Sequence, residues 1–203
     1  MFYMVHQIQS LLSLSLSLFI VLNAFGNIPL FLSLLKGIPR KRQKQIVFRE
    51  LLIALIIIII FNYIGVWLLK FLNITQEIVQ IAGGVILFLL SLKMLFPKEK
   101  KEIEAELKKI TEPFIVPLAI PLVAGPAVLA AVMVYSPQIP NVLMVGAIFI
   151  AWFLTLLILL LSAHLSSWMG GRGLIALERL MGFIMVLIAI QMFLSGLKTF
   201  MKT

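Results

Sequence analysis

The chain has 203 residues, of which 62% are hydrophobic and 12% charged, and its mean hydropathy is +1.14. A soluble domain is about half apolar and about a quarter charged, so lipid is expected to solvate much of this chain. The absence of cysteine excludes disulfides, thiolate catalysis and iron–sulfur clusters. The net charge of +9 lies in short loops, without the aromatic and basic pattern of a nucleic-acid-binding protein.

Six apolar segments follow one another along the chain, each near the roughly 20 residues that a helix needs to cross the hydrocarbon core. Membrane β-strands would alternate over about ten residues, whereas Leu51–Phe61 is an unbroken apolar run. Helices are therefore predicted. The six spans are approximately Ile8–Leu35, Ile46–Leu69, Ile78–Phe96, Phe114–Tyr135, Val142–Leu165 and Leu174–Leu197.

Basic residues are concentrated in alternate loops. Thirteen lie in the loops after spans one, three and five, whereas only Lys70, Lys198 and Lys202 lie on the opposite side. Because positive charge marks cytoplasmic loops, the pattern predicts that both termini are outside the cell. Lys93, near the inner end of span three, is expected to extend toward the interface.

The two halves of the chain resemble each other at an offset near 98 residues. Aligning Gly84 with Gly182 also aligns Met94 with Met192 and Lys93 with Gln191. Each half has three spans, so the second copy crosses the membrane in the opposite sense, as in many secondary transporters. The predicted fold is all-α: a polytopic membrane bundle of six transmembrane helices in two inverted three-helix repeats, with helices one and four broken. The first repeat covers residues 1–96, a charged cytoplasmic linker covers 97–111, and the second repeat covers 112–203.

The first of the two predicted helix breaks lies in span one. Asn23, Gly26, Asn27 and Pro29 fall within two turns of an otherwise apolar helix. Pro29 has no N–H for the carbonyl of residue 25, and Gly26 eases unwinding. An unpaired amide in hydrocarbon costs several kcal/mol, so both asparagines need protein partners or water.

The second break lies in span four, where prolines recur every four residues and then meet a glycine. Pro117, Pro121 and Pro126 each leave the carbonyl four residues earlier without its helical donor, and Gly125 precedes the last of them. Two interrupted helices at matching places in two halves indicate a transport site. The predicted solute-binding residues are Asn23, Gly26, Asn27, Pro29, Pro117, Pro121, Gly125 and Pro126. Half-helix N-termini attract carboxylates and free carbonyls accept ammonium groups, so a zwitterion fits such a site.

Other polar residues are interpreted as structural. The serines of span one, among them Ser13 and Ser17, are expected to bond to their own helix or to pack against a neighbour. Glu50 and Glu178 are expected to form surface ion pairs with the adjacent arginines. No carboxylate lies clearly at mid-membrane, and no metal site, phosphate loop or catalytic triad is visible, so neither a cofactor nor an enzymatic activity is predicted.

The segments NAFGNIPLFLSL, IAGGVILFLLSLKMLFP, VPLAIPLVAGPAVLA and ERLMGFIMVLIAIQMFLSG resemble the MarC family of bacterial and archaeal multi-pass membrane proteins. The resemblance implies six helices, a location in the cell (inner) membrane and a distant relation to amino-acid exporters of the LysE type. Some members are associated with small neutral amino acids. Two positions depart from the family pattern: Asn23-Ala24 stands where many relatives have Asp-Pro, and Ala127 stands where glycine is usual. The first departure removes a ligand for a coupling ion.

The function predicted from these observations is secondary transport or export of small polar solutes such as small neutral amino acids, with a coupling proton or sodium ion as an open question. The partners are then the lipid bilayer and the solute; no nucleic acid is expected, and a homo-oligomer is compatible with the sequence. The alternatives are a membrane scaffold or assembly factor that transports nothing, and an intramembrane enzyme.

Overall fold

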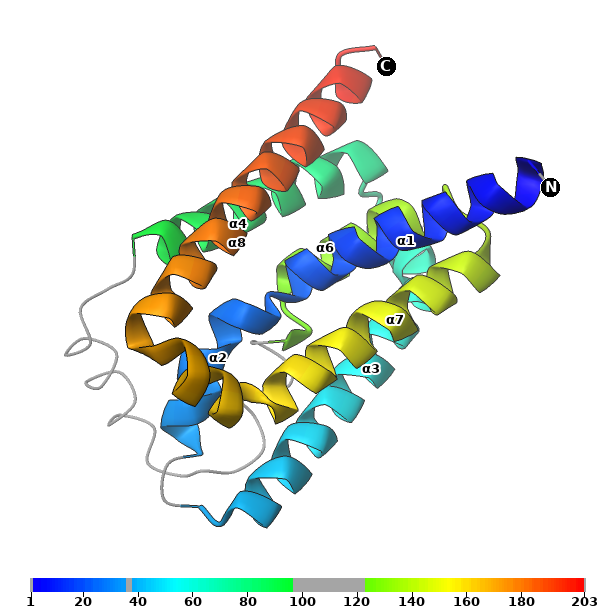
Figure 1. Ribbon diagram of the computed structural model, residues 1–203. Helices are drawn as coiled ribbons and strands as arrows, with labels where there is room; N and C mark the ends of the chain where they lie inside the picture. Colours follow the sequence, from blue (N-terminus) through cyan, green and yellow to red (C-terminus); the bar gives the residue numbers. More distant parts are fainter. Residues whose placement is uncertain (1, 36–37, 97–122, 203) are drawn as a thin grey trace.

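The computed structural model describes residues 2–35, 38–96 and 123–202, and every regular element within these ranges is a helix (Figure 1). The helices, labelled as in the figure, are α1 (Phe2–Leu22), α2 (Ala24–Leu34), α3 (Arg40–Phe71), α4 (Gln76–Leu95), α6 (Pro126–Tyr135), α7 (Asn141–Leu160) and α8 (Ser162–Phe200).

Five segments of the described chain are long and apolar enough to cross a membrane. They are Gln9–Ile28, Arg40–Phe71, Gln76–Leu95, Asn141–Leu160 and Arg172–Phe200, and a shorter apolar helix covers Pro126–Tyr135. Between half and three quarters of the residues in these spans are not buried, and the exposed ones include many large apolar side chains such as Trp67 and Phe153. Such surfaces need lipid, so the prediction of a helical multi-pass membrane protein is confirmed. The predicted linker 97–111 and the first part of span four lie outside the described residues.

The connection between the last two spans differs from the prediction. A loop was expected between Leu165 and Leu174, but α8 begins at Ser162, directly after Leu161. Gly170 interrupts this helix with φ +65°, a backbone conformation that glycine adopts without steric cost. The chain therefore turns between the two spans through a kinked helix instead of an irregular loop.

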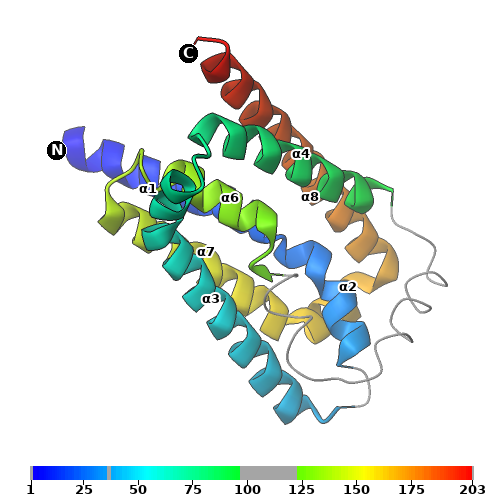
Figure 2. The ribbon, with the colours of Figure 1, turned by 180° about the vertical axis from the view of Figure 1, so that it is seen from behind.

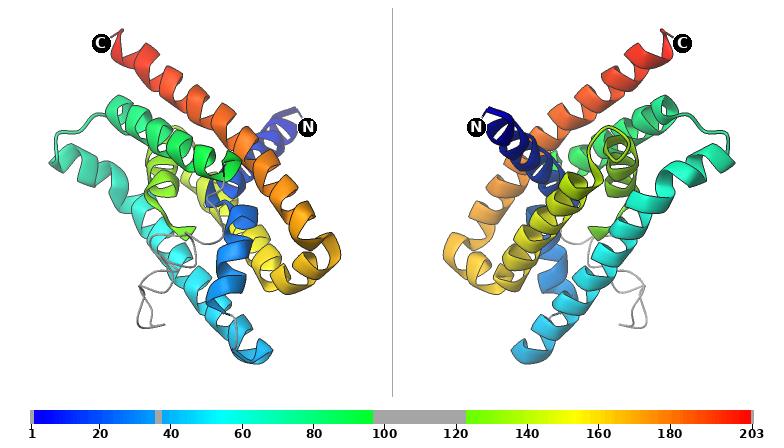
Figure 3. Two further views of the ribbon diagram at one scale, coloured as in Figure 1. Left: turned by 90° about the vertical axis from the view of Figure 1, so that its left-hand side faces the viewer. Right: turned by 90° about the vertical axis from the view of Figure 1, so that its right-hand side faces the viewer.

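The helices pack as neighbours that are distant in sequence. The helix pair α4 and α8 lies side by side, as do α3 and α7, and α1 runs through the bundle between α7, α6 and α8 (Figures 1 and 2). Both termini lie at one end of the bundle, and the start of α3 lies at the other end (Figure 3). This arrangement puts the basic first turns of α3 at the end opposite to Lys198 and Lys202.

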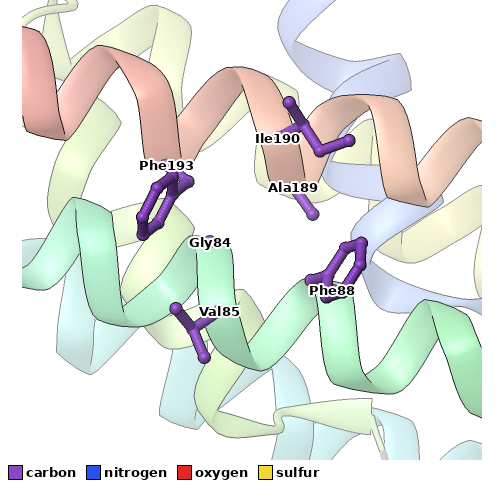
Figure 4. A pocket seen from close by; sticks show the side chains of 6 residues that line it. All are labelled: Gly84, Val85, Phe88, Ala189, Ile190 and Phe193. Carbon is purple, nitrogen blue, oxygen red and sulfur yellow. The ribbon is translucent and has the colours of Figure 1, made fainter.

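Glycines let the backbones of α4 and α8 approach closely. A Cβ atom at Gly84 would lie 2.9 Å from the carbonyl oxygen of Ala189 and 2.8 Å from the backbone nitrogen of Phe193. In membranes, where helices gain little from hydrophobic association, such close contact between small residues holds helices together. Figure 4 shows this contact from outside, with an apolar hollow of about 370 Å³ over Gly84 that is flanked by Phe88 and Phe193.

Polar contacts fix α3 against the second half of the chain. The indole N–H of Trp152 in α7 donates to the carbonyl of Leu51 at 2.7 Å. The amide of Asn62 donates to Asn141 Oδ1 at 2.9 Å, and the hydroxyl of Ser136 donates to the carbonyl of Asn62 at 2.9 Å. The first two bonds hold α3 in register with α7, and the third holds α3 against Ser136, the residue that follows α6.

Candidate functional site

The break in the first span lies at Asn23. This residue adopts φ +53°, a left-handed conformation that asparagine tolerates better than most residues, and it separates α1 from α2. Its Oδ1 accepts a hydrogen bond from the backbone N–H of Gly26 at 3.2 Å, as an N-cap side chain does. A Cβ at Gly26 would lie 2.5 Å from that oxygen, so glycine is needed for the amide to fit. The sequence motif therefore does break the helix, but at the asparagine, while the backbones of Gly26 and Pro29 lie within α2.

Asn27 satisfies the backbone carbonyl that this break leaves without its helical donor. In a continuous helix the carbonyl of Leu22 would accept from the N–H of Gly26, which is now directed to Asn23. The amide nitrogen of Asn27 donates to the Leu22 carbonyl instead, at 3.2 Å. Asn27 is 7% exposed, and the structure gives its Oδ1 no hydrogen bond within the described chain. One end of this amide is thus structural, and the other end can accept a hydrogen bond from a solute.

The second break meets the described chain at Gly125 and Pro126. Gly125 is extended, with φ −66° and ψ 167°, and Pro126 is the first residue of α6. Proline suits this position because the first helical N–H has no partner within the helix and the fixed φ of the ring matches the helix. Gly125, Ala127 and Val128 at this N-terminus are buried, while Pro126 is exposed, and the helix start carries a partial positive charge.

The two breaks face one cavity of about 370 Å³, here called the amide cavity. Four of the predicted site residues line it: Asn23, Asn27, Gly125 and Pro126. The remaining lining comes from Val21, Ala127 and Val128 and from one face of α4: Ile86, Leu89, Leu90 and Lys93. Its volume lies within the range of small-molecule sites, and its few polar groups converge on an otherwise apolar wall.

Of the other predicted site residues, only Gly26 can be compared with this wall. Gly26 shapes the break without lining the cavity. Only the backbone of Pro29 is described, and Pro117 and Pro121 lie outside the described residues. The prediction that the two breaks meet at one polar cavity therefore rests on four residues.

Lys93 is the functional candidate that the sequence analysis missed. It was interpreted as a side chain that extends to the membrane interface, whereas the structure places it on the wall of the amide cavity. Within the described chain it has no ion-pair partner. Its alignment with Gln191, a polar residue at the matching repeat position, was the signal in the sequence. A cation beside two amides and a helix N-terminus suits an anionic group such as a carboxylate.

Glu50 corrects a second interpretation. A surface ion pair was expected, and the pair with Arg49 exists at 2.8 Å, but the Glu50 side chain is only 1% exposed. Its Oε2 atom is buried without a hydrogen-bond partner among the described residues. The reason is the helix position: Glu50 falls on the same face of α3 as buried Val47 and Ala54, whereas Arg49 points outward. Groups of three or more metal-ligating side chains are not found in the part of the chain that the structure describes.

Comparison with known proteins assigns the chain to a protein family. The model of the MarC family integral membrane proteins matches residues 8–201. The chain is similar to the UPF0056 inner membrane protein YhgN of Escherichia coli K12, with 45% identity over 95% of this chain and 98% of the relative. It is also similar to UPF0056 membrane proteins of Buchnera aphidicola from Baizongia pistaciae (44% identity, 94% and 98% covered) and Methanocaldococcus jannaschii (35% identity, 90% and 93% covered). No solved structure matches. The chain, with its multiple apolar spans and two helix breaks, therefore belongs to the MarC family of integral membrane proteins.

Proposed function

We propose that this protein is a secondary transporter or exporter of small polar solutes, such as small neutral amino acids. The observation that carries the proposal is the amide cavity, which lies where two helices break and combines uncharged amides, a cation and a helix N-terminus. Lipid-exposed breaks would leave backbone groups unpaired in hydrocarbon, so breaks of this kind occur where protein or a watery cavity covers them. Transport sites are typically built from such half-helices.

The lining of the amide cavity suits an α-amino acid. Lys93 and the N-terminus of α6 favour a carboxylate, since both present positive charge; Ala127 supplies the N–H there, because Pro126 has none and that of Val128 donates to the Gly125 carbonyl. The Oδ1 of Asn27 can accept a hydrogen bond from an ammonium group, because its amide nitrogen is already used by Leu22. The remaining wall is apolar and leaves space for a short, uncharged side chain. These features favour a small zwitterion over a cationic or large solute.

The contacts between α4 and α8 support the two inverted repeats. Gly84 approaches the carbonyl oxygen of Ala189 and the backbone of Phe193, and Gly182 approaches Ser91 and Leu95. Ala189 and Phe193 lie 98 residues beyond Ser91 and Leu95, the same offset that relates Gly182 to Gly84. Exchanging the two helices thus maps one set of contacts onto the other.

The other helix neighbours follow the same exchange. The first helix, α1, packs against α7, while α6 packs against α3. Likewise α6 contacts α4, and the α1–α2 pair contacts α8. A two-fold axis between antiparallel helices runs across them, so it lies in the plane of the membrane, as an inverted repeat requires.

We further propose that the protein lies in the cell (inner) membrane with six spans and both termini outside. The name of the E. coli relative states an inner membrane location. Both termini lie at one end of the bundle, and the basic residues of α3 lie at the other, which supports a cytoplasmic position for that end. Coupling to a proton or sodium ion is part of the proposal, and the buried, half-paired carboxylate of Glu50 is a candidate for it.

One observation favours the alternative of a scaffold that transports nothing. Asn23 and Asn27 both bond to the backbone of their own break, so these amides have a structural reason to be present. The transport and scaffold proposals then differ in the role they give to Lys93, because its charge makes no structural contact within the described chain.

Uptake of a labelled amino-acid panel into proteoliposomes tests the proposal, with Lys93→Gln as the variant and Lys198→Gln as the matched control. We expect the wild type and Lys198→Gln to transport small neutral amino acids and Lys93→Gln to lose this uptake while keeping its thermal stability. The glutamine keeps a polar side chain of similar length, so only the charge is removed. Equal uptake by both variants would remove Lys93 from the site. Uptake by none of the three proteins would favour the scaffold.

A further inference from the structure

A second cavity lies among the same helices, nearer to the two termini. It has a volume of about 590 Å³ and is here called the hydroxyl cavity, because hydroxyl and amide side chains from four helices line it. They include Ser13, Ser17, Gln80, Gln138, Gln191 and Ser195. None of the described residues that line it is charged.

The position of these polar groups is unusual for lipid-facing helices. Ser13 and Ser17 lie within the span Gln9–Ile28, and Gln191 and Ser195 lie within Arg172–Phe200. Ser17 satisfies its hydroxyl hydrogen on the carbonyl of Ser13 at 2.9 Å, as expected for serine in a membrane helix. Backbone bonding does not explain why glutamine side chains meet these serines in a cavity that four helices line. Polar groups that converge at membrane depth mark a water-filled cavity.

Matching faces of α4 and α8 each form the wall of one cavity. Lys93 and Leu90 of α4 line the amide cavity, while Gln191 and Ile188 of α8 line the hydroxyl cavity. Each α8 residue lies 98 positions beyond its α4 counterpart, the offset found in the sequence and in the glycine contacts. The same helix face therefore forms a cavity wall in each half.

Only a thin layer of packed side chains separates the cavities. Three helices line both of them, and on each helix a buried residue lies between the two linings: Leu18 of α1, Gly83 of α4 and Val132 of α6, of which Leu18 and Val132 are 2% and 0% exposed. On α1 the lining of the hydroxyl cavity ends at Ser17 and that of the amide cavity begins at Val21. On α6 the lining of the amide cavity ends at Val128 and that of the hydroxyl cavity begins at Val134. At about 1.5 Å per residue, the layer is roughly 6–9 Å thick.

From this arrangement we propose that the two cavities are the opposite ends of one solute path, closed between them by Leu18, Gly83 and Val132. The inference rests on the proposed transport function and adds its route: solute enters a neutral cavity of hydroxyls and amides at one face and meets Lys93 at the other. The absence of charge among the described residues of the hydroxyl cavity suits a solute without net charge. In an inverted-repeat transporter the two halves exchange conformations. Each exchange opens the layer toward one cavity and closes it toward the other.

Single cysteines test the path cleanly, because the native chain has none. The positions are Ser195→Cys in the hydroxyl cavity, Leu89→Cys in the amide cavity and Leu187→Cys on α8, which is as exposed as Leu89 (53% and 56%) but lines neither cavity. A charged, membrane-impermeant thiol reagent is applied to intact cells and to inverted membrane vesicles. We expect Ser195→Cys to react from one side only, Leu89→Cys from the other side only, and Leu187→Cys from neither, since it faces lipid.

Opening the layer provides the second measurement. In a Leu18→Ala background, Ser195→Cys and Leu89→Cys should each become reactive from both sides. If Leu18→Ala does not yield folded protein, Val132→Ala serves the same purpose, and the sidedness of the two single cysteines already decides the question. A Ser195→Cys that reacts from neither side, or two cavities that react from the same side, would overturn the path.

These outcomes are independent of the amino-acid assay. Opposite-sided labelling without uptake of any panel solute would support the path and refute the proposed substrates. Uptake of a panel solute with an unreactive Ser195→Cys would support transport and refute this route.

Discussion

Asn27 is the residue whose replacement best separates a binding site from a structural break. Its amide nitrogen holds the Leu22 carbonyl at 3.2 Å, and its oxygen has no partner in the described chain. Asn27→Ala leaves a buried carbonyl unpaired, which costs about 1–3 kcal/mol in the free energy of unfolding. A hydrogen bond that the oxygen accepts from a charged ammonium group is worth about 1.5–3 kcal/mol, so solute affinity should fall roughly ten- to a hundredfold.

The matched control is Asn62→Ala. Asn62 is also a buried asparagine, at 3% exposed, and its amide also donates one hydrogen bond, to Asn141 at 2.9 Å, but it lines neither the amide cavity nor the hydroxyl cavity. We expect Asn62→Ala to lose no more thermal stability in detergent than Asn27→Ala, because the Oδ1 atom that it removes is buried without a partner among the described residues, and we expect only Asn27→Ala to lose solute affinity, measured on the same purified samples. If the two variants lose stability equally and bind solute equally well, Asn27 serves only the helix break and the reasoning fails.

Three further predictions concern topology and packing. A single cysteine at Gln45 should be protected from an impermeant reagent in intact cells while one at Lys202 reacts, and the reverse result would invert the proposed orientation. Gly84→Leu should abolish folding and Gly84→Ala should lower the free energy of unfolding by about 1–3 kcal/mol, since a Cβ there lies 2.8 Å from the backbone of α8. The control is the lipid-facing Ala82→Leu, which should change the thermal melt little. Trp152→Phe should cost about 1 kcal/mol by removing the 2.7 Å bond to Leu51, and an unchanged melting temperature would show that this bond contributes nothing.

The sequence predicted the spans and breaks well, because both depend on local chemistry. An unbroken apolar run such as Leu51–Phe61 has one stable solution in lipid, and Gly125 followed by Pro126 starts a helix in almost any context. Even so, the position of the first break was displaced. Proline and glycine seemed to mark it at residues 26–29, but the side chain of Asn23 caps a new helix three residues before Gly26.

What the sequence could not supply is the contact between distant segments. Lys93 and Asn27 are 66 positions apart, and only the packing of α4 against the breaks makes them neighbours in one cavity. The burial of Glu50 depends in the same way on what covers one face of α3. The serines of α1 were interpreted correctly as bonded to their own helix, yet their second role on a cavity wall needed the partner glutamines of α4 and α8.

The start of α2 also explains how a departure from the family pattern is tolerated. Asp-Pro is the strongest form of a helix start, since the carboxylate accepts the third N–H and proline occupies the first helical position. Asn23-Ala24 retains the acceptor, because its Oδ1 binds the N–H of Gly26, and gives up both the ring and the negative charge. A residue before proline is held in an extended conformation, whereas Asn23 is left-handed, which the alanine at position 24 allows. The exchange therefore preserves where the helix begins while it removes a negative charge from the lining that Asn23 shares with Lys93; under the proposed transport function, variation at this dipeptide would tune solute preference without rebuilding the fold.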